Sequence, residues 1–264
     1  MINQMQKAII KKDFGSIASN KNLMPALIIV PLVFTVFIPL VFILVIHFAP
    51  DQVSELEDML GMLPDSMQSD NMSETIVIFL LNNIMPVFFM LIPIMASSIM
   101  SASSFVGEKE KRTLETLLYS PLTLSQIFQS KVWAAFILSM SVTLVSFILM
   151  IIVVTTGVFL TLGNIIIPGI SWLFTILVVS PAVSLLSIVI IVRGSAKSKT
   201  MEESQQRAIY LIMPLLLLII GQFTGIILIN AWYLLVTGAI LAVIAWLLMR
   251  KSMSKFTYES LLMR

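Results

Sequence analysis

Uninterrupted apolar runs constrain this chain more than any other feature. The first, residues 23–49, contains no Asp, Glu, Lys or Arg, and a helix needs about 20 apolar residues to cross the hydrocarbon core of a bilayer. Only 11% of all residues are charged and the mean hydropathy is +1.02, whereas soluble domains have about 25% charged residues. The sequence therefore predicts an all-α polytopic membrane protein.

Six spans are predicted, joined by polar segments of very different charge. The spans are residues 23–49, 75–102, 132–160, 171–192, 209–229 and 231–249. Between or after them lie an acidic loop (50–74), a first polar island (103–131), a second polar island (193–208) and a basic tail (250–264). The long apolar stretch 209–249 is divided in two because one span needs only about 20 residues.

Residues 1–22 precede the first span and combine apolar positions such as Ile9 and Ile17 with four lysines. This pattern predicts an amphipathic helix at the membrane interface. A cleaved signal peptide is the alternative, but the run that follows is longer than an h-region of about 7–15 residues and has no evident small-residue cleavage site. The run is therefore assigned as the first span.

Charge distribution predicts the orientation of the chain. All 16 Lys and Arg residues fall in the N-terminal segment, the two islands and the tail, whereas loop 50–74 carries seven carboxylates and no cation. Positive residues near span ends stay in the cytoplasm. Both termini and both islands are thus predicted to be cytoplasmic and the acidic loop external, while five or seven spans would split the basic segments between the two sides.

The sequence of the first island predicts an amphipathic helix followed by a capped one. Leu114, Leu117 and Leu118 are spaced to form one apolar stripe opposite charged residues, and Pro121 is expected to end that helix by restricting the residue before it. Thr123 and Gln126 then match a capping box that starts the next helix. A solvated linker beside the membrane is the alternative interpretation of this segment. In the second island, Thr200 and Glu203 match another capping box.

Several enzyme classes are disfavoured by the residue types. No G-x-x-x-x-G-K-[ST] motif is present to hold ATP phosphates, and there is no cysteine for a disulfide or a thiolate site. His47 is the only histidine, too few for a zinc site with three or four ligands. The predicted span cores also lack the paired carboxylates of a proton relay or a membrane protease.

The first island resembles the signature segment between the second and third spans of ABC-2-type transporter permeases. The matching positions are Gly107, Glu108, Glu110, Thr113, Leu114, Glu115, Leu117, Leu118, Pro121 and Lys131. Arg112 departs from the pattern, because the family commonly has glycine immediately before Thr-Leu-Glu. The resemblance extends to the six-span plan and the amphipathic N-terminal segment.

This resemblance implies the membrane subunit of an ABC exporter with type V-like architecture, in the cell membrane of a bacterium or archaeon. The first island is then a coupling segment that docks on a separate ATPase, with Arg112 and Glu115 pairing with that partner and the three leucines filling its groove. The chain itself would be no enzyme and hold no cofactor or metal, with ATP and Mg on the ATPase. No nucleic-acid partner is implied.

The resemblance also implies two membrane halves, in a homodimer or a heterodimer with a similar permease. Gly221 and Gly225 form a G-x-x-x-G face suited to close helix contact, either between copies or within the chain. Four polar residues of the second and fifth spans are candidates for the cargo path or, equally, for hydrogen bonds between spans. They are Asn82, Asn83, Gln222 and Thr224.

Composition favours an amphipathic or hydrophobic cargo such as a peptide, lipid or drug. The spans show no charged ring, and the chain's 18 Met and 16 Phe residues offer adaptable apolar surface. A non-transporting sensor or accessory subunit that binds a cytoplasmic partner through the first island remains the alternative function.

Overall fold

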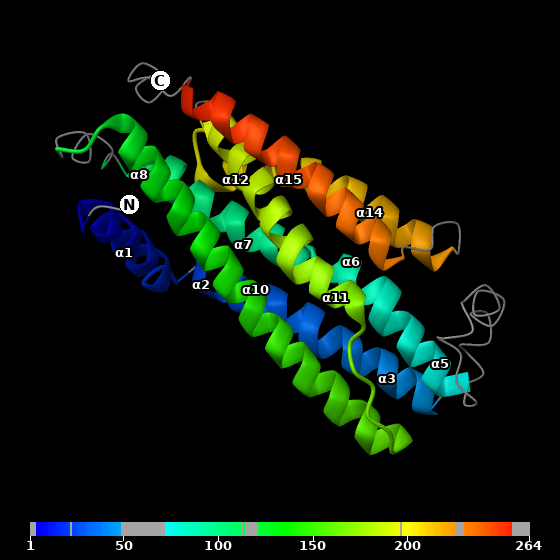
Figure 1. Ribbon diagram of the computed structural model, residues 1–264. Helices are drawn as coiled ribbons and strands as arrows, with labels where there is room; N and C mark the ends of the chain where they lie inside the picture. Colours follow the sequence, from blue (N-terminus) through cyan, green and yellow to red (C-terminus); the bar gives the residue numbers. More distant parts are fainter. Residues whose placement is uncertain are drawn as a thin grey trace.

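The computed structural model describes residues 4–21, 23–48, 72–111, 113, 121–195, 197–224 and 230–254 (Figure 1). This part of the chain contains helices and no strand. Six helical stretches are long and apolar enough to cross a membrane: Leu23–Phe48, Ser73–Glu110, Leu124–Leu162, Ile170–Ser195, Met201–Phe223 and Ala231–Ser252. The predicted all-helical polytopic class is confirmed, with six helices of spanning length.

Three of these helices contain a π-helical turn that ends two residues before a proline. A proline lacks the N–H that would bond the carbonyl four residues earlier, and a π turn is a common local adjustment of the helix. The turns and their prolines are η1 (Val33–Phe37) before Pro39, η4 (Leu80–Ile84) before Pro86, and η6 (Thr175–Val179) before Pro181. The first helix, α2 (Leu23–Leu32), η1 and α3 (Ile38–Phe48), thus stays continuous across its prolines.

The second span lies at the centre of the bundle. In its apolar stretch 89% of the residues are buried, against 17% in the first and sixth spans. It consists of α5 (Met72–Phe79), η4, α6 (Met85–Phe89), α7 (Leu91–Ala102), the π turn η5 (Ser103–Gly107) and α8 (Glu108–Glu110). The other spans therefore pack around a helix that has little contact with lipid.

Small hydroxyl residues join α7 to two neighbours, α10 (Leu124–Leu162) and α12 (Ser180–Ser195). Ser139 Oγ donates to the Pro93 carbonyl at 3.0 Å and shares a hydrogen bond of 2.8 Å with Ser184 Oγ. Ser187 Oγ donates to the Ile94 carbonyl at 3.1 Å. Small polar residues let membrane helices approach closely while satisfying buried polar groups, so this junction fixes three spans together.

Helix α10 has 39 residues, a length of about 58 Å at 1.5 Å per residue, so it extends well beyond a hydrocarbon core of about 30 Å. The predicted capping box at its start is confirmed, because Thr123 and Gln126 exchange both side-chain hydrogen bonds. Gly163 ends the helix in the left-handed conformation, with φ 74°, which glycine adopts without a Cβ clash.

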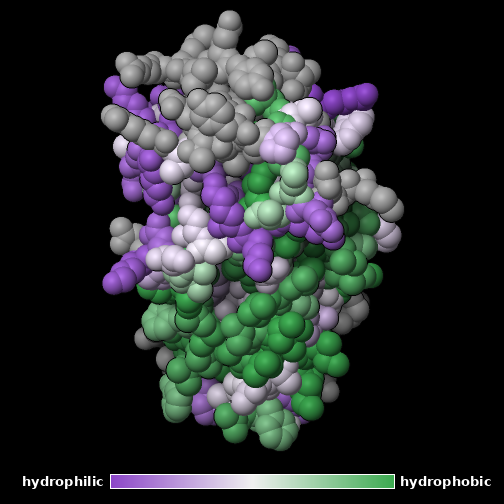
Figure 2. All heavy atoms as spheres, turned by 90° about the vertical axis from the view of Figure 1, so that its left-hand side faces the viewer, coloured by the Kyte–Doolittle hydropathy of each residue, from purple (hydrophilic) through white to green (hydrophobic). Residues whose placement is uncertain are grey.

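The fifth and sixth spans lie at the periphery. Helix α13 (Met201–Gln206) leads into α14 (Ile209–Phe223), and α15 (Ala231–Ser254) packs along α12. At the start of α13, Thr200 Oγ1 accepts from the Glu203 N–H, but the Glu203 carboxylate bonds to the Lys199 N–H, so only half of the second predicted box forms. Figure 2 shows hydrophobic residues gathered in a band below a hydrophilic end.

The helices continue past several predicted span boundaries at that hydrophilic end. The second runs on to Glu110 rather than 102, the third begins at Leu124 rather than 132, and the helical stretch of the fifth begins at Met201 rather than 209. Hydropathy marks only the apolar part of a helix, whereas caps and polar contacts decide where the backbone leaves helical geometry. Most of the acidic loop and the tail beyond residue 254 lie outside the described residues.

Candidate functional site

The first island begins on the end of the second span. Of its predicted coupling residues, the structure describes Gly107, Glu108, Glu110, Thr113 and Pro121. The apolar stripe and its charged neighbours lie outside the described residues, namely Arg112, Leu114, Glu115, Leu117 and Leu118. The described geometry is therefore that of the base of the island, where it leaves the bundle.

Glu108 is the centre of this base. Its carboxylate pairs on one side with Lys131 of α10, Nζ to Oε2 2.5 Å, and on the other with Lys12 of helix α1 (Gln4–Ala18). The Glu108 and Lys131 side chains are only 8% and 2% exposed, whereas that of Lys12 is 50% exposed. One carboxylate thus holds the second span, the third span and the N-terminal helix together.

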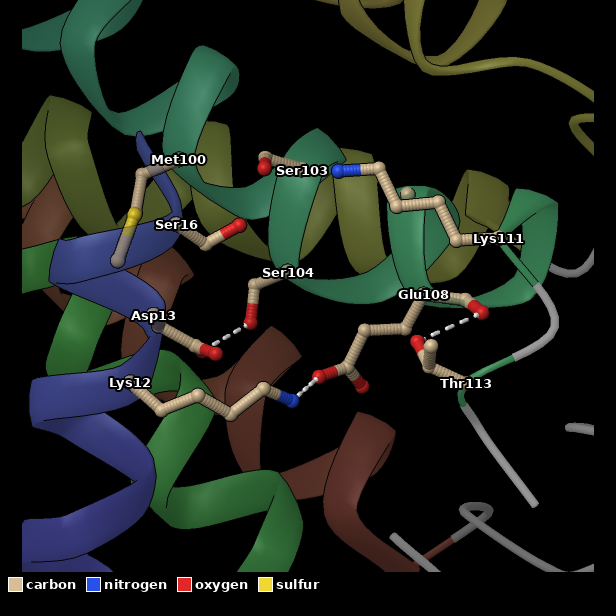
Figure 3. Close-up of a pocket in the computed structure, with 10 residues that line it drawn as sticks. Lys12, Asp13, Ser16, Met100, Ser103, Ser104, Glu108, Lys111 and Thr113 are labelled. Carbon is tan, nitrogen blue, oxygen red and sulfur yellow. Dashed lines mark hydrogen bonds and ion pairs between the residues drawn. The ribbon is translucent and has the colours of Figure 1, made fainter. Parts of the chain in front are cut away.

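Asp13 and Ser104 extend this contact into a cluster. Ser104 Oγ donates to Asp13 Oδ2 at 2.5 Å (Figure 3). The Ser104 carbonyl accepts from Lys131 Nζ. We call Lys12, Asp13, Ser104, Glu108 and Lys131 the charge cluster. Two lysines face two carboxylates with hydrogen bonds among them, which is the condition under which buried charge is tolerated.

Helix α1 contributes to the cluster because its buried stripe contains polar residues. The stripe is Gln6, Ile9, Asp13 and Ile17, at helical spacing, and it packs on the start of α10. Gln6 Nε2 donates to the Gln126 carbonyl at 3.4 Å. The apolar positions Ile9 and Ile17, from which the sequence predicted an amphipathic helix, are both on the buried face.

Burial raises the pKa of the Asp13 carboxyl above its ordinary value of 3.8, while the nearby Lys131 ammonium and the Ser104 hydrogen bond oppose that rise. Loss of hydration penalises the charged form of a carboxyl group. Glu108 adds a smaller repulsion that also raises the pKa, and Lys12 a smaller attraction that lowers it.

Because the folded-state pKa of Asp13 is raised, the native state binds this proton more tightly than the unfolded state. Its favourable contribution to stability is therefore complete below pH 3.8 and is lost as the pH rises through the folded-state pKa. We expect wild type to lose stability relative to Asp13→Asn over that window, and then to run parallel to it. Unfolding in detergent micelles between about pH 4 and 8 measures this. If wild type instead gains stability relative to Asp13→Asn as the pH rises, the pKa of Asp13 is not raised in the folded protein.

The second island is fastened to the same base. Glu110 Oε2 accepts from the Met201 N–H at the start of α13, at 3.2 Å. Gly107 packs against Met201 so closely that a Cβ atom would lie 2.7 Å from its sulfur. The segment Gly107–Glu110 is therefore where the second span meets α1, α10 and α13.

A cavity of about 160 Å³ lies beside the charge cluster (Figure 3). Ser16, Ser103 and Lys111 line it together with members of the cluster. This polar space can hold water molecules, since several hydroxyl and charged groups surround it. Within the part of the chain that the structure describes, no group of three or more His, Cys, Asp or Glu residues could hold a metal ion.

The structure gives hydrogen bonds between segments to three of the four candidate path residues. Asn82 Oδ1 accepts from the Gly169 N–H at 2.7 Å, and the Asn83 carbonyl accepts from Gln222 Nε2 at 2.8 Å. Gln222 is fully buried and its Oε1 has no partner among the described residues. Thr224 is exposed and bonds to carbonyls of its own helix.

The candidate dimer contact is only half described. Gly221 lies in α14 and is partly exposed, and Gly225 lies outside the described residues. Whether the Gly221 and Gly225 face packs against a second copy or within the chain therefore stays a prediction.

Sequence reasoning did not identify Asp13 and Ser104 as site residues. A signal for Asp13 was present, because it is the only carboxylate in residues 1–48 and lies four residues from both Ile9 and Ile17. A charge in the apolar stripe of an amphipathic helix requires a buried partner. Ser104 gave no comparable signal, because serine is common in this span.

Five helices of spanning length packed around a sixth, with a hydrophilic end (Figure 2), define a multi-pass membrane protein. Residues 7–231 match the family described as ABC-2 family transporter protein, and the chain belongs to this family. Comparisons with curated proteins and with solved structures gave no match. Membership makes the chain a permease of an ABC transporter and implies an ABC ATPase as its partner.

Proposed function

We propose that this chain exports an amphipathic or hydrophobic cargo, such as a peptide, lipid or drug, with energy from a separate ATPase that docks on the first island. The observation that carries this proposal is the convergence of the second span, α1, α10 and α13 on residues 107–110. A segment that begins at such a junction can pass a displacement to several helices at once, since packed elements move as units.

The charge pattern supports an orientation with both termini and both islands in the cytoplasm. All 16 Lys and Arg residues belong to these segments, and positive residues are retained there. The proposal places α1 at the cytoplasmic interface in a type V-like architecture, in the cell membrane of a bacterium or archaeon.

The division of labour with the ATPase follows from the motifs. The chain lacks a phosphate-binding glycine loop, so ATP and Mg belong to the partner and this chain holds no catalytic group. Arg112 and Glu115 are proposed to pair with the ATPase while the leucine stripe fills its groove, as in an interface with an apolar centre and charged rim.

A second membrane half completes the proposed transporter, either another copy or a similar permease. The G-x-x-x-G face at Gly221 is one candidate contact. Asn82, Asn83, Gln222 and Thr224 are proposed to border the path. The bond from Gln222 to the Asn83 carbonyl supports contact between the second and fifth spans at that depth.

Co-purification from the native membrane tests the docking role. The detergent-solubilised chain is expected to elute with an ATPase, and Leu117→Asp or Glu115→Ala is expected to lose at least ten-fold of the co-eluting ATPase activity, about 1.4 kcal/mol or more of binding free energy. Glu202→Ala, an exposed carboxylate of the second island, is the control and should retain it. Elution of wild type without any ATP-hydrolysing partner would instead favour the sensor or accessory function.

A further inference from the structure

A concave surface lies at the elbow between α1 and the first span, lined by residues 18–21, 24, 25, 28 and 29. Its volume is about 500 Å³ and it is open to the outside. One part is polar, formed by Ser19, Asn20 and Lys21, and the other is apolar, formed by Met24, Ile28 and Ile29. From Met24 to Ile29 the helix rises about 8 Å, comparable with the about 5–10 Å to which an interfacial helix buries its apolar face at the boundary of headgroups and acyl chains.

The shape of the elbow is fixed by the backbone. Asn20 Oδ1 accepts from the Leu23 N–H at 3.2 Å, and the Asn20 carbonyl accepts from the Met24 N–H at 3.1 Å. Leu23 and Leu27 are buried in the bundle on the opposite face of the helix. The polar and apolar parts of the elbow are therefore held in fixed relative positions, and such preorganisation favours binding.

Lys21 places a positive charge on the elbow, and no carboxylate is among its described lining residues. Within the described part of the chain, Lys7, Lys11 and Lys21 form no ion pair, whereas Lys12 is taken up by Glu108. Lys7 and Lys11 lie on the same face of α1 as Ala18, which borders the cavity, because residues four and seven apart share a helix face. Asp13, the only carboxylate in residues 4–48, is buried against Ser104.

We propose that the elbow binds one anionic phospholipid, with its phosphate at Lys21 and one acyl chain along Met24, Ile28 and Ile29. Apolar side chains of a membrane-crossing helix form half of the surface and are 39%, 46% and 57% exposed, respectively. A free phosphate would leave that half uncovered. Clusters of basic residues beside a span attract anionic lipid headgroups. The proposal requires the membrane-spanning fold but not export or ATPase docking.

Native mass spectrometry of the full chain in detergent tests the headgroup contact. Phosphatidylglycerol, phosphatidylcholine and inorganic phosphate are the three probes. Lys21→Gln is expected to weaken retention of phosphatidylglycerol about five-fold, the effect of one lysine near an anionic surface. Lys197→Gln, an exposed lysine of the second island, should leave it unchanged. Equal losses for both lipids, or equal binding of inorganic phosphate, would overturn the proposal.

A second pair of variants tests the acyl contact without changing charge. Met24→Trp fills the apolar part of the elbow and is expected to reduce phosphatidylglycerol retention several-fold. Val41→Trp enlarges a side chain with 41% exposure on the same span, outside the elbow, and should not. If Met24→Trp retains as much lipid as Val41→Trp, the acyl site does not exist.

Discussion

Lys131→Met is expected to lower the free energy of unfolding by about 3–5 kcal/mol, because it removes one partner of a buried ion pair and leaves the other charge behind. Lys131 is 2% exposed, and its ammonium contacts Glu108 and the Ser104 carbonyl. Methionine fills much of the same volume, so the effect reports the lost charge. Titration with SDS in mixed micelles, followed by circular dichroism, measures it.

Lys12→Met is the matched control, because Lys12 contacts the same carboxylate from a side chain that is 50% exposed. An exposed pair contributes about 1 kcal/mol or less. Adding Glu108→Gln to Lys131→Met should recover part of the loss, since the buried carboxylate, left with only the half-exposed Lys12 as its partner, is then gone. Equal losses for the two lysine variants would show that burial does not distinguish the two pairs.

The asymmetry between these lysines describes how the base of the first island is built. The buried pair joins the second and third spans, whereas the pair with Lys12 is half exposed and therefore costs less free energy to open. Helix α1 therefore has the weaker of the two ionic attachments to Glu108, reinforced by the hydrogen bond between Ser104 and Asp13.

The number of spanning helices could be predicted because each span is a continuous apolar run, which can be recognised without knowing its tertiary contacts. The cap at Thr123 was likewise readable, since both partners lie within four residues. The charge cluster was not, because Asp13 and Ser104 are 91 residues apart and Lys131 follows 27 residues later. Only the packing of both α1 and α10 against the end of the second span brings these residues together.

The polar residues in the spans show a second limit of the sequence. An asparagine in an apolar run indicates a buried polar contact, but not its partner. Asn82 bonds to the Gly169 N–H, where a Cβ atom on residue 169 would lie 2.7 Å from its Oδ1. A glycine at position 169 thus leaves room for this contact. The two residues are 87 positions apart, so no local sequence pattern predicts that they pair.

Trp172 joins the second and fourth spans away from the charge cluster. It lies in α11 (Ile170–Phe174), is 1% exposed, and its indole N–H donates to the Leu81 carbonyl at 2.8 Å. Its ring centroid lies 5.2 Å from that of Phe89 and 5.5 Å from that of Phe147. The indole therefore packs with the two phenylalanine rings in an aromatic cluster and also donates a hydrogen bond to the π-helical turn η4.

Trp172→Ala is accordingly expected to lower the free energy of unfolding by about 3–5 kcal/mol, the range for removing a large buried aromatic side chain. Trp232→Ala, in the sixth span with 67% exposure, should change it by about 0.5 kcal/mol or less. Trp172→Phe separates the two contributions, because it keeps a ring but leaves the Leu81 carbonyl without this donor, a loss of about 1–3 kcal/mol. SDS unfolding of the three variants measures these values, and similar losses for the two alanine variants would mean that Trp172 does not fill the core as described.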